Sequence, residues 1–331
     1  MTKRILVTGG SGFIGSHFVL KLLSLGHSIL NIDIETYATE FSLHSRFHHQ
    51  KSGKYEHLKF NICETNKLIK SMMEYKPDYV IHFAAESHVD NSILKSKPFI
   101  DTNIYGTYSL LEAIRTVKDN GEFPKKVISV STDEVFGSII TGKFNEKSNL
   151  KPNSPYSASK AASDLLVRAW TKTYNLPIII SNCSNNYGPG QHIEKLIPKT
   201  IYNILNGHDI PIYGNGNNVR DWIYVEDHVD ALMKLIDKGR IGQRYVIGAD
   251  CEKTNLEIVF QICEIMSQIS SKFVNCESLI QYVDDRLGHD YRYATDSKKM
   301  NVATNWKATT KLGTGLFKTI EYYMTLQRFG V

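Results

Sequence analysis

The stretch Ile5-Leu-Val-Thr-Gly-Gly-Ser-Gly-Phe-Ile-Gly15 decides the fold of this chain. A short apolar segment enters a turn with glycines at positions 9, 12 and 15, and a helical apolar pattern follows until Gly26. Strand, glycine turn and helix form the first unit of a parallel α/β sheet that binds a dinucleotide. Gly9, Gly12 and Gly15 permit the sharp turn and the close approach of a pyrophosphate, which the free N–H groups at the helix start would bind.

The residue after the next predicted strand indicates which dinucleotide the chain binds. That strand covers residues 28–32 and is followed by Asp33. A carboxylate at this place accepts hydrogen bonds from a ribose diol and repels a 2′-phosphate. The sequence therefore predicts NAD as the cofactor, and not NADP.

Strand and helix patterns alternate through the first part of the chain. Apolar runs predict further strands at residues 58–62, 78–83, 127–131 and 177–181. Residues 99–117 have the pattern of an amphipathic helix, with an apolar face formed by Ile104, Tyr108, Leu111 and Ile114. The alternation predicts an α/β fold with a Rossmann-type doubly wound parallel sheet.

The strict alternation ends after the polar, turn-rich segment 182–189. We therefore predict a smaller, mixed α/β substrate-binding lobe in the second part of the chain. The expected NAD-binding domain covers residues 1–187 and is rejoined by about 221–249, and the second lobe covers residues 188–220 and 250–331. A strand predicted at residues 244–247 would return to the main sheet.

Thr132, Asp133 and Glu134 follow directly after the strand predicted at residues 127–131. In an open α/β sheet, the ligand pocket lies outside the carboxyl ends of the strands. Two carboxylates and a hydroxyl at this edge are suited to be a general acid, a general base and a positioning group. The alternative is a surface loop whose acidic residues cap the next element.

Tyr156 and Lys160 lie four residues apart at the start of a predicted helix, so their side chains share one face. A pair with this spacing also occurs without any function. After a dinucleotide motif it has a chemical meaning, because a lysine cation about 4 Å from a phenol would lower the pKa of the phenol toward neutrality. Tyr156 would then serve as a base.

The composition excludes several classes of protein. The chain has 331 residues, of which 42% are hydrophobic, and its net charge of +5 includes no Lys/Arg run typical of nucleic-acid binding. A strand is predicted from Arg4 and no apolar run reaches membrane-spanning length, so we expect a cytoplasmic protein without signal peptide or membrane contact. The five cysteines are scattered, and His44, His48 and His49 fit no ligand spacing, so no disulfide framework and no metal site are predicted.

Several segments resemble one family of enzymes. Residues 8–15 (TGGSGFIG), 131–137 (STDEVFG), 155–164 (PYSASKAASD) and 285–293 (DRLGHDYRY) are similar to motifs of the extended short-chain dehydrogenase/reductases. Residues 82–93, 182–189, 194–198 and 217–228 extend this similarity over nearly the whole chain. The Thr-Asp-Glu triplet and the DRLGHD run are most similar to the dTDP-glucose 4,6-dehydratases.

The resemblance implies a catalytic role for five residues. Tyr156 would be the base for oxidation at C4 of the sugar, Lys160 its partner, and Thr132 the hydroxyl that holds the sugar. Asp133 would be the acid and Glu134 the base for elimination of water across C5 and C6. NAD would take a hydride from C4 and return it to C6, so the lyase would form dTDP-4-dehydro-6-deoxy-glucose for deoxysugar biosynthesis without net NADH.

The resemblance also implies the binding positions. Residues that match cofactor contacts are Gly9, Gly12, Phe13, Ile14, Gly15, Asp33, Thr36, Asn61, Ile62, Phe83, Ala84, Ala85, Ser87, Thr102, Tyr156, Lys160 and Asn186. Residues that match substrate contacts are Ser87, Thr132, Asn185, Lys195, Leu196, Ile197, Pro211, Tyr213, Arg220, Asn255, Arg286 and His289. Asn61, Asn91 and Phe136 replace a common aspartate, arginine and tyrosine of the family.

Other functions remain open at this stage. A UDP-glucose 4,6-dehydratase or a sugar-nucleotide 4-epimerase would use the same scaffold, although epimerisation needs no acid and base at C5 and C6. A non-enzymatic NAD-binding protein would have the fold without the chemistry. The choice between dTDP and UDP depends on loops of the second lobe. A homodimer is expected, but no sequence feature establishes it.

Overall fold

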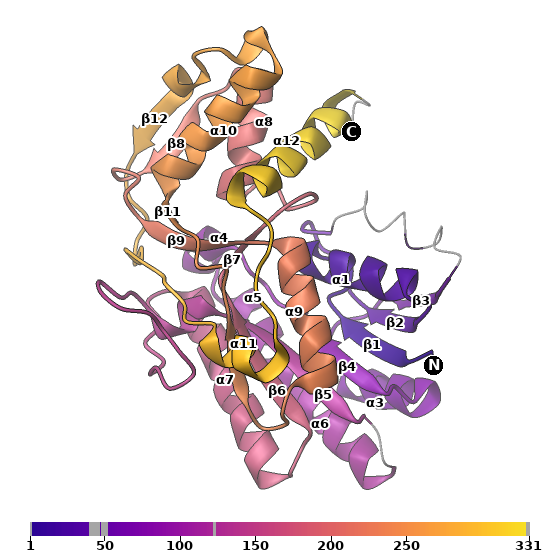
Figure 1. The fold of residues 1–331 in the computed structure, drawn as a ribbon. Helices are drawn as coiled ribbons and strands as arrows, with labels where there is room; N and C mark the ends of the chain where they lie inside the picture. The colour runs from indigo at the N-terminus through magenta and orange to yellow at the C-terminus, as the bar shows by residue number, and fades with distance from the viewer. Residues whose placement is uncertain (1, 40–46, 48–51, 122–123, 329–331) are drawn as a thin grey trace.

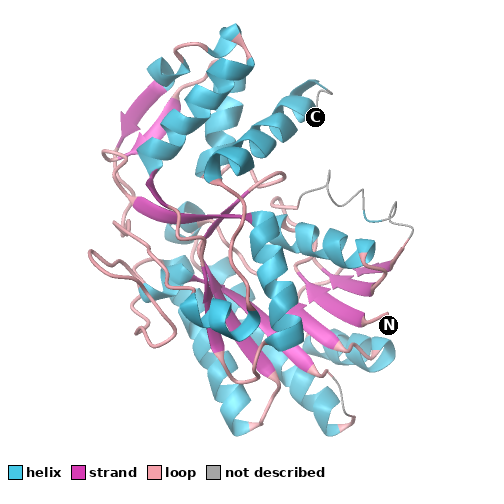
Figure 2. Ribbon diagram, in the orientation of Figure 1, coloured by secondary structure: helices cyan, strands magenta, loops and turns pink. Residues whose placement is uncertain are grey.

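A computed structural model describes residues 2–39, 47, 52–121 and 124–328. Its centre is a parallel sheet with the strand order β10-β6-β5-β4-β1-β2-β3. The strands are β1 (Arg4–Thr8), β2 (Ser28–Ile32), β3 (Lys54–Leu58), β4 (Tyr79–His82), β5 (Lys126–Thr132), β6 (Ile178–Cys183) and β10 (Arg244–Ile247). Helices cover both faces of this sheet (Figures 1 and 2). The predicted Rossmann-type doubly wound sheet is therefore confirmed.

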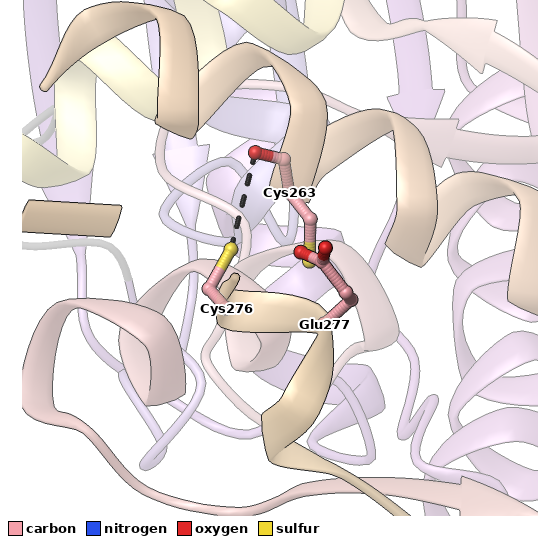
Figure 3. A group of neighbouring side chains, drawn as sticks. All are labelled: Cys263, Cys276 and Glu277. Carbon is pink, nitrogen blue, oxygen red and sulfur yellow. Dashed lines mark hydrogen bonds between the residues drawn. The ribbon is translucent and has the colours of Figure 1, made fainter. Parts of the chain in front are cut away.

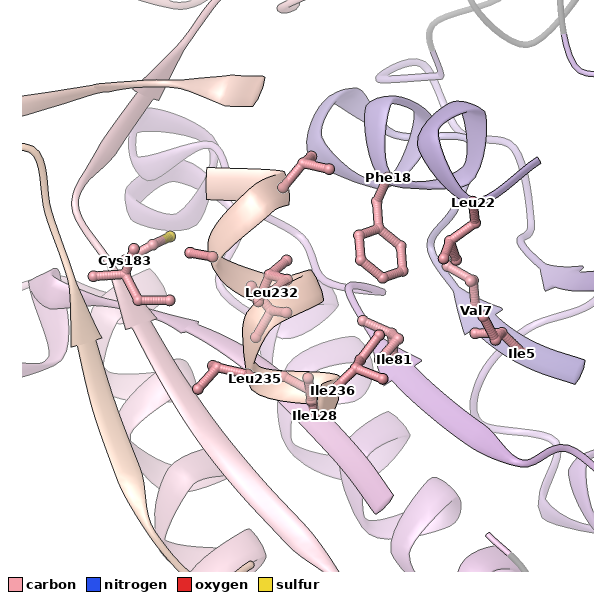
Figure 4. Packing of buried hydrophobic residues seen from close by; sticks show 14 of the residues in the cluster. Ile5, Val7, Phe18, Leu22, Ile81, Ile128, Cys183, Leu232, Leu235 and Ile236 are labelled. Atoms are coloured by element: carbon pink, nitrogen blue, oxygen red, sulfur yellow. The ribbon is translucent and has the colours of Figure 1, made fainter. Parts of the chain in front are cut away.

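Alternate residues of each central strand point to opposite faces of the sheet. Ile5 and Val7 of β1 pack with Phe18 of α1 (Phe13–Ser24), and α9 (Val225–Lys238) and α11 (Lys298–Thr304) complete that core (Figure 4). Leu6 packs on the other face, where α3 (Thr65–Tyr75), α6 (Thr107–Asp119) and α7 (Pro155–Thr173) lie. Because helices cover both faces, the sequences of the central strands are nearly continuous apolar runs.

The second lobe has its own core. A three-stranded sheet joins β7 (Asn185–Tyr187), β9 (Val219–Tyr224) and β11 (Glu252–Thr254), and β8 (Ile210–Tyr213) pairs in parallel with β12 (Ile280–Val283). Three helices, α8 (Leu196–Asn206), α10 (Asn255–Ile269) and α12 (Leu312–Arg328), pack against these strands. The lobe stands beyond the carboxyl ends of the main strands (Figure 1).

The strand predicted at residues 244–247 is confirmed, whereas the one predicted at residues 58–62 is wrong. β10 pairs in parallel with β6, so the chain returns to the main sheet as predicted. The third strand was predicted at residues 58–62, but β3 covers Lys54–Leu58. β3 is an edge strand with alternating exposure, so it lacks the apolar run of a central strand. The apolar Phe60 and Ile62 instead follow the strand and face the ligand cavity.

The predicted helix at residues 99–117 is present but interrupted. It comprises α5 (Lys97–Phe99), the π-helix η2 (Ile100–Gly106) and α6. The apolar face was predicted wrongly in part, since Tyr108 is 36% exposed, whereas Asn103 and Thr107 are buried. A π-turn holds more residues than an α-turn, so the buried face shifts along the sequence. The segment with His44, His48 and His49 lies outside the described residues.

No helix in the described ranges is both long and apolar enough to cross a bilayer.

Asp227 connects α9 to the segment that leads into α12. Its Oδ1 accepts hydrogen bonds from Thr309 N at 3.2 Å and Thr309 Oγ1 at 3.0 Å, and its Oδ2 accepts one from Thr310 N at 2.9 Å. Trp306 Nε1 donates to the Asp227 carbonyl at 3.1 Å. This carboxylate therefore satisfies backbone donors that no strand or helix satisfies.

Asp227→Asn should lower the free energy of unfolding by about 1 kcal/mol, because the amide keeps one acceptor oxygen and leaves one or more of the partly buried donors of Thr309 and Thr310 without an acceptor. Urea unfolding followed by far-UV circular dichroism measures this change. Asp230→Asn on the same helix is the control, since Asp230 is half-exposed and only pairs with Lys21 at 3.4 Å. Equal effects of the two substitutions would contradict the structural role of Asp227.

Candidate active site

A cavity of about 330 Å³ lies at the carboxyl ends of the main strands. Its walls come from the glycine turn, from the segments after β2, β4, β5 and β6, and from α7. All residues predicted to contact the cofactor line this cavity, and Thr132, Asp133 and Glu134 line it too. The structure thus brings together residues from position 9 to position 195.

The glycine turn forms a cradle that only glycine permits. A Cβ at position 15 would lie 2.2 Å from Gly9 O, and a Cβ at position 9 would lie 2.5 Å from Ala84 N. Gly9 also has a φ of 74°, which disfavours other residues. Since α1 begins directly after Gly12, its free N–H groups face the cavity, and the turn fits a pyrophosphate.

Asp33 is held in place at the end of β2. Its Oδ2 accepts a hydrogen bond from Ser11 N at 2.9 Å, and its Oδ1 accepts one from Glu35 N at 2.8 Å. These contacts fix the carboxylate against the glycine turn, where its remaining lone pairs can accept hydrogen bonds from a ribose diol. The site therefore fits the dinucleotide that the sequence predicted.

Asp133 and Glu134 form the short 3₁₀ helix η3 (Asp133–Phe136) at the end of β5. Thr132 Oγ1 accepts a hydrogen bond from Glu134 N at 3.2 Å and donates one to Asp133 Oδ1 at 3.3 Å. Asp133 is 1% exposed, and its Oδ2 has no hydrogen-bond partner in the part of the chain that the structure describes. One buried carboxyl oxygen thus remains available for a proton.

The surroundings of the two carboxyl groups shift their pKa values to different extents. Burial raises the pKa of Asp133 well above its usual value, and the negative charges of Glu134 and Asp221 add to this rise. Burial also raises the pKa of Glu134, but the cations Lys195, Arg220 and Arg286 oppose it. Asp133 is therefore suited to be the acid and Glu134 the base.

Tyr156 lies in the first turn of α7, which Ser154 caps by accepting a hydrogen bond from Ser157 N at 3.1 Å. Lys160 Nζ donates to the Val130 carbonyl at 2.8 Å. Burial raises the pKa of Tyr156, and nearby Glu134 raises it further. The sequence predicted that Lys160 lowers this pKa, and this is wrong for the protein's own groups, because desolvation dominates in a buried site.

The predicted substrate residues fall into two groups. Ser87, Thr132, Asn185 and Lys195 line the cavity, and Lys195 Nζ donates to the Ser87 carbonyl at 2.8 Å. The others lie in the second lobe outside the cavity lining: Leu196, Ile197, Pro211, Tyr213, Arg220, Asn255, Arg286 and His289. Ile197 is 1% exposed and contributes to the core of that lobe.

Sequence reasoning missed Asn103 in the π-helix η2. Its amide accepts a hydrogen bond from Glu86 N at 2.9 Å and donates to Glu86 O at 3.0 Å and to Ser159 Oγ at 2.8 Å. It therefore ties the loop after β4 to α7 beside Tyr156. A polar residue on the buried side of an amphipathic helix was the available signal.

Cys263, Cys276 and Glu277 lie together in the second lobe, with one ligand atom each within 4.8 Å of the others (Figure 3). Cys276 Sγ lies 3.9 Å from the Cys263 carbonyl. Burial raises the pKa of both thiols, and metal binding requires thiolates. We assign the two thiols to the core of this lobe.

The chain is similar to known proteins over nearly its full length. The sequence profile of the GDP-mannose 4,6 dehydratase family matches residues 6–319. A probable dTDP-glucose 4,6-dehydratase of Sinorhizobium fredii is 45% identical, over 97% of this chain and 93% of the relative. The dTDP-glucose 4,6-dehydratase of Haemophilus influenzae is 44% identical, over 97% of both chains.

A solved structure agrees with these relatives. The dTDP-glucose 4,6-dehydratase of Streptomyces venezuelae, solved with NAD bound, superimposes with a TM-score of 0.91 at 37% identity, over 98% of both chains. Fold, site residues and sequence thus lead to one assignment. The chain belongs to the GDP-mannose 4,6-dehydratase family and, within it, to the dTDP-glucose 4,6-dehydratases of the extended short-chain dehydrogenase/reductases.

Proposed function

We propose that this protein is an NAD-dependent dTDP-glucose 4,6-dehydratase, which removes water from dTDP-glucose and forms dTDP-4-dehydro-6-deoxy-glucose. The observation that carries this proposal is the position of Asp133 and Glu134, a buried and a partly buried carboxyl group in the same cavity as the glycine turn. We also propose that residues 1–187 with about 221–249 hold the cofactor, and that residues 188–220 and 250–331 hold the nucleotide sugar.

NAD, when bound, would accept a hydride from C4 and return it to C6, and its positively charged nicotinamide ring would oppose the rise in the Tyr156 pKa. The glycine turn would bind its pyrophosphate, and Asp33 a ribose diol. Asn103 would keep the loop after β4 against α7, so that Tyr156 stays aligned with the sugar.

Tyr156 would take the proton of the C4 hydroxyl in the first step. Thr132 would hold the same hydroxyl, and Lys160 would fix the helix face that carries Tyr156 through its bond to Val130. The resulting C4 ketone makes the neighbouring C5–H acidic, which a carboxylate could not deprotonate before. This dependence sets the order of the steps.

Glu134 would then remove the C5 proton while Asp133 donates its proton to the departing C6 oxygen, which leaves as water. When the hydride returns to C6, Glu134 would give the proton back to C5. The two pKa shifts suit these roles, because three cations oppose the rise at Glu134 while negative charges increase it at Asp133. An epimerase would need neither group, so the acid and base pair favours dehydration over epimerisation.

We propose that two copies of the chain associate through α6 and α7. Tyr108 of α6 and Leu165 of α7 are 36% and 55% exposed, as are Tyr105 of η2, directly before α6, and Tyr174, directly after α7, at 52% and 40%. The rings of Tyr105 and Tyr108 lie 5.7 Å apart, so the apolar surface is continuous there. Exposed apolar patches of this kind mark protein interfaces, and a face made of two long helices can pair with its own copy.

The proposed activity predicts that the protein converts dTDP-glucose to a product that has lost one water, with no net release of NADH. Mass spectrometry of separate incubations with dTDP-glucose and UDP-glucose measures this and identifies the preferred nucleotide. Asp133→Asn and Glu134→Gln should lose at least about 100-fold in product formation, since each removes one proton-transfer group. Both variants should still reduce bound NAD, which absorbance of the reduced nicotinamide detects.

Stoichiometric NADH release by the parent would contradict this mechanism, and so would parental rates in the two variants. An epimerised product of unchanged mass would favour the epimerase.

Asp133→Asn should also make the stability of the protein less sensitive to alkali. A carboxyl whose pKa is raised above 3.8 by folding contributes stability below that pH and loses it as the pH rises through the raised pKa. The melting temperature of the variant relative to the parent should therefore increase as the pH rises above about 4. Asp230→Asn is the exposed control, and a constant difference at all pH values would contradict the buried, protonated state of Asp133.

Tyr108→Glu should convert the dimer to monomers, because two like charges would meet without solvent at the interface. Sedimentation velocity measures the change. Phe260→Glu is the matched control, since Phe260 is 47% exposed on α10, away from the proposed face. A monomeric parent, or dimers of both variants, would contradict this interface.

A further inference from the structure

Asp90 connects the two lobes beside the active site. It lies in α4 (Val89–Leu94), after the loop that follows β4, and its carboxylate reaches two side chains of the second lobe. Arg286 Nε lies 2.6 Å from Asp90 Oδ1, and Arg286 Nη2 donates to Oδ2 at 3.1 Å. Tyr213 donates its hydroxyl to the same Oδ2 at 3.2 Å. One carboxylate thus binds two residues that were predicted to contact the substrate.

Further contacts fix the orientation of Arg286. The ring of Tyr213 lies 5.0 Å from the guanidinium carbon, and Arg286 N donates to Asp285 Oδ1 at 2.8 Å. The same Asp285 oxygen lies 2.6 Å from His289 Nδ1, and the His289 ring meets the Tyr213 ring edge-on at 6.2 Å. These side chains form one packed group that Asp90 holds from the opposite lobe.

Part of the guanidinium group remains available for an anion. Asp90 forms an ion pair with Nε and accepts a hydrogen bond from Nη2, and neither contact involves Nη1. Arg286, Arg220 and Lys195 all oppose the rise in the pKa of Glu134, so the three cations act on the same carboxylate. An anion of two phosphates suits such a group, because the arginine fork binds phosphate oxygens in a fixed geometry.

We propose that Asp90 is a positioning residue for the nucleotide sugar, which holds Arg286 and Tyr213 in the orientation that receives the diphosphate. This inference rests on the proposed function and adds a residue to it. Asp90 acts through Arg286 and does not touch the reacting atoms.

The opposite role is competition, in which the carboxylate occupies Arg286 and the diphosphate must displace it. The two roles predict opposite changes in KM. Removal of a positioning group raises KM, because the long side chain must then be ordered by the substrate. Removal of a competing negative charge lowers KM. The open Nη1 edge favours positioning, since Asp90 and a phosphate can bind the guanidinium together.

Asp90→Asn removes the charge at nearly constant size. It should raise KM for dTDP-glucose about tenfold and weaken the binding of dTDP alone by a similar factor, with kcat within about twofold of the parent. In an Arg286→Ala background the same substitution should change KM by less than about twofold, because the partner is absent. Steady-state kinetics and isothermal titration with dTDP measure these values, and Asp230→Asn is the control.

A KM below that of the parent would overturn the proposal in favour of competition. An equal effect of Asp90→Asn with and without Arg286 would also overturn it, since the role would then be structural. Tyr213→Phe keeps the ring and loses the hydroxyl that donates to Asp90, so it should raise KM by about two- to threefold. An unchanged KM in this variant would contradict the proposal. This test remains usable if the Asp90→Asn variant does not fold. A parent that does not convert dTDP-glucose would refute the proposed function instead, while the titration with dTDP would still test Asp90.

Discussion

The backbone of the glycine turn lies so close to its neighbours that no side chain fits at two of its positions. A Cβ at Gly15 would meet Gly9 O at 2.2 Å, and a Cβ at Gly9 would meet Ala84 N at 2.5 Å. This contact sets the start of α1 against the ends of β1 and β4, and it forms the floor of the cavity.

Burial is the second constraint, and it acts on four titratable groups of the site. It raises the pKa of Asp133, Glu134 and Tyr156, and it lowers that of Lys160, because a dry environment disfavours every charge. The groups differ only in the charges near them. Cations of the second lobe act on Glu134, so this lobe influences the pKa of the proposed base. Asp90 pairs with one of these cations, Arg286, and its proposed role is to position that side chain.

Two wrong predictions of secondary structure and burial have a common cause. Residues 58–62 and Tyr108 were both assigned from apolar character, which predicts burial but not what covers a residue. Phe60 and Ile62 are apolar because they wall a cavity, and they are not in a strand. Tyr108 is apolar on an exposed face, which a second copy of the chain would cover. The periodicity of apolar residues cannot distinguish a residue of the core from one that lines a ligand cavity or lies in a protein interface.

The sequence by itself determined the parallel sheet, the glycine turn with Asp33, and the acids and the tyrosine at the carboxyl edge, because each is a local pattern of neighbouring residues. Only the tertiary structure decided that burial raises the pKa of Asp133, that Lys160 binds Val130, and that Asp90 meets Arg286. These properties depend on burial and on distances between residues far apart in the chain. Spacing along the sequence carries no information on either quantity.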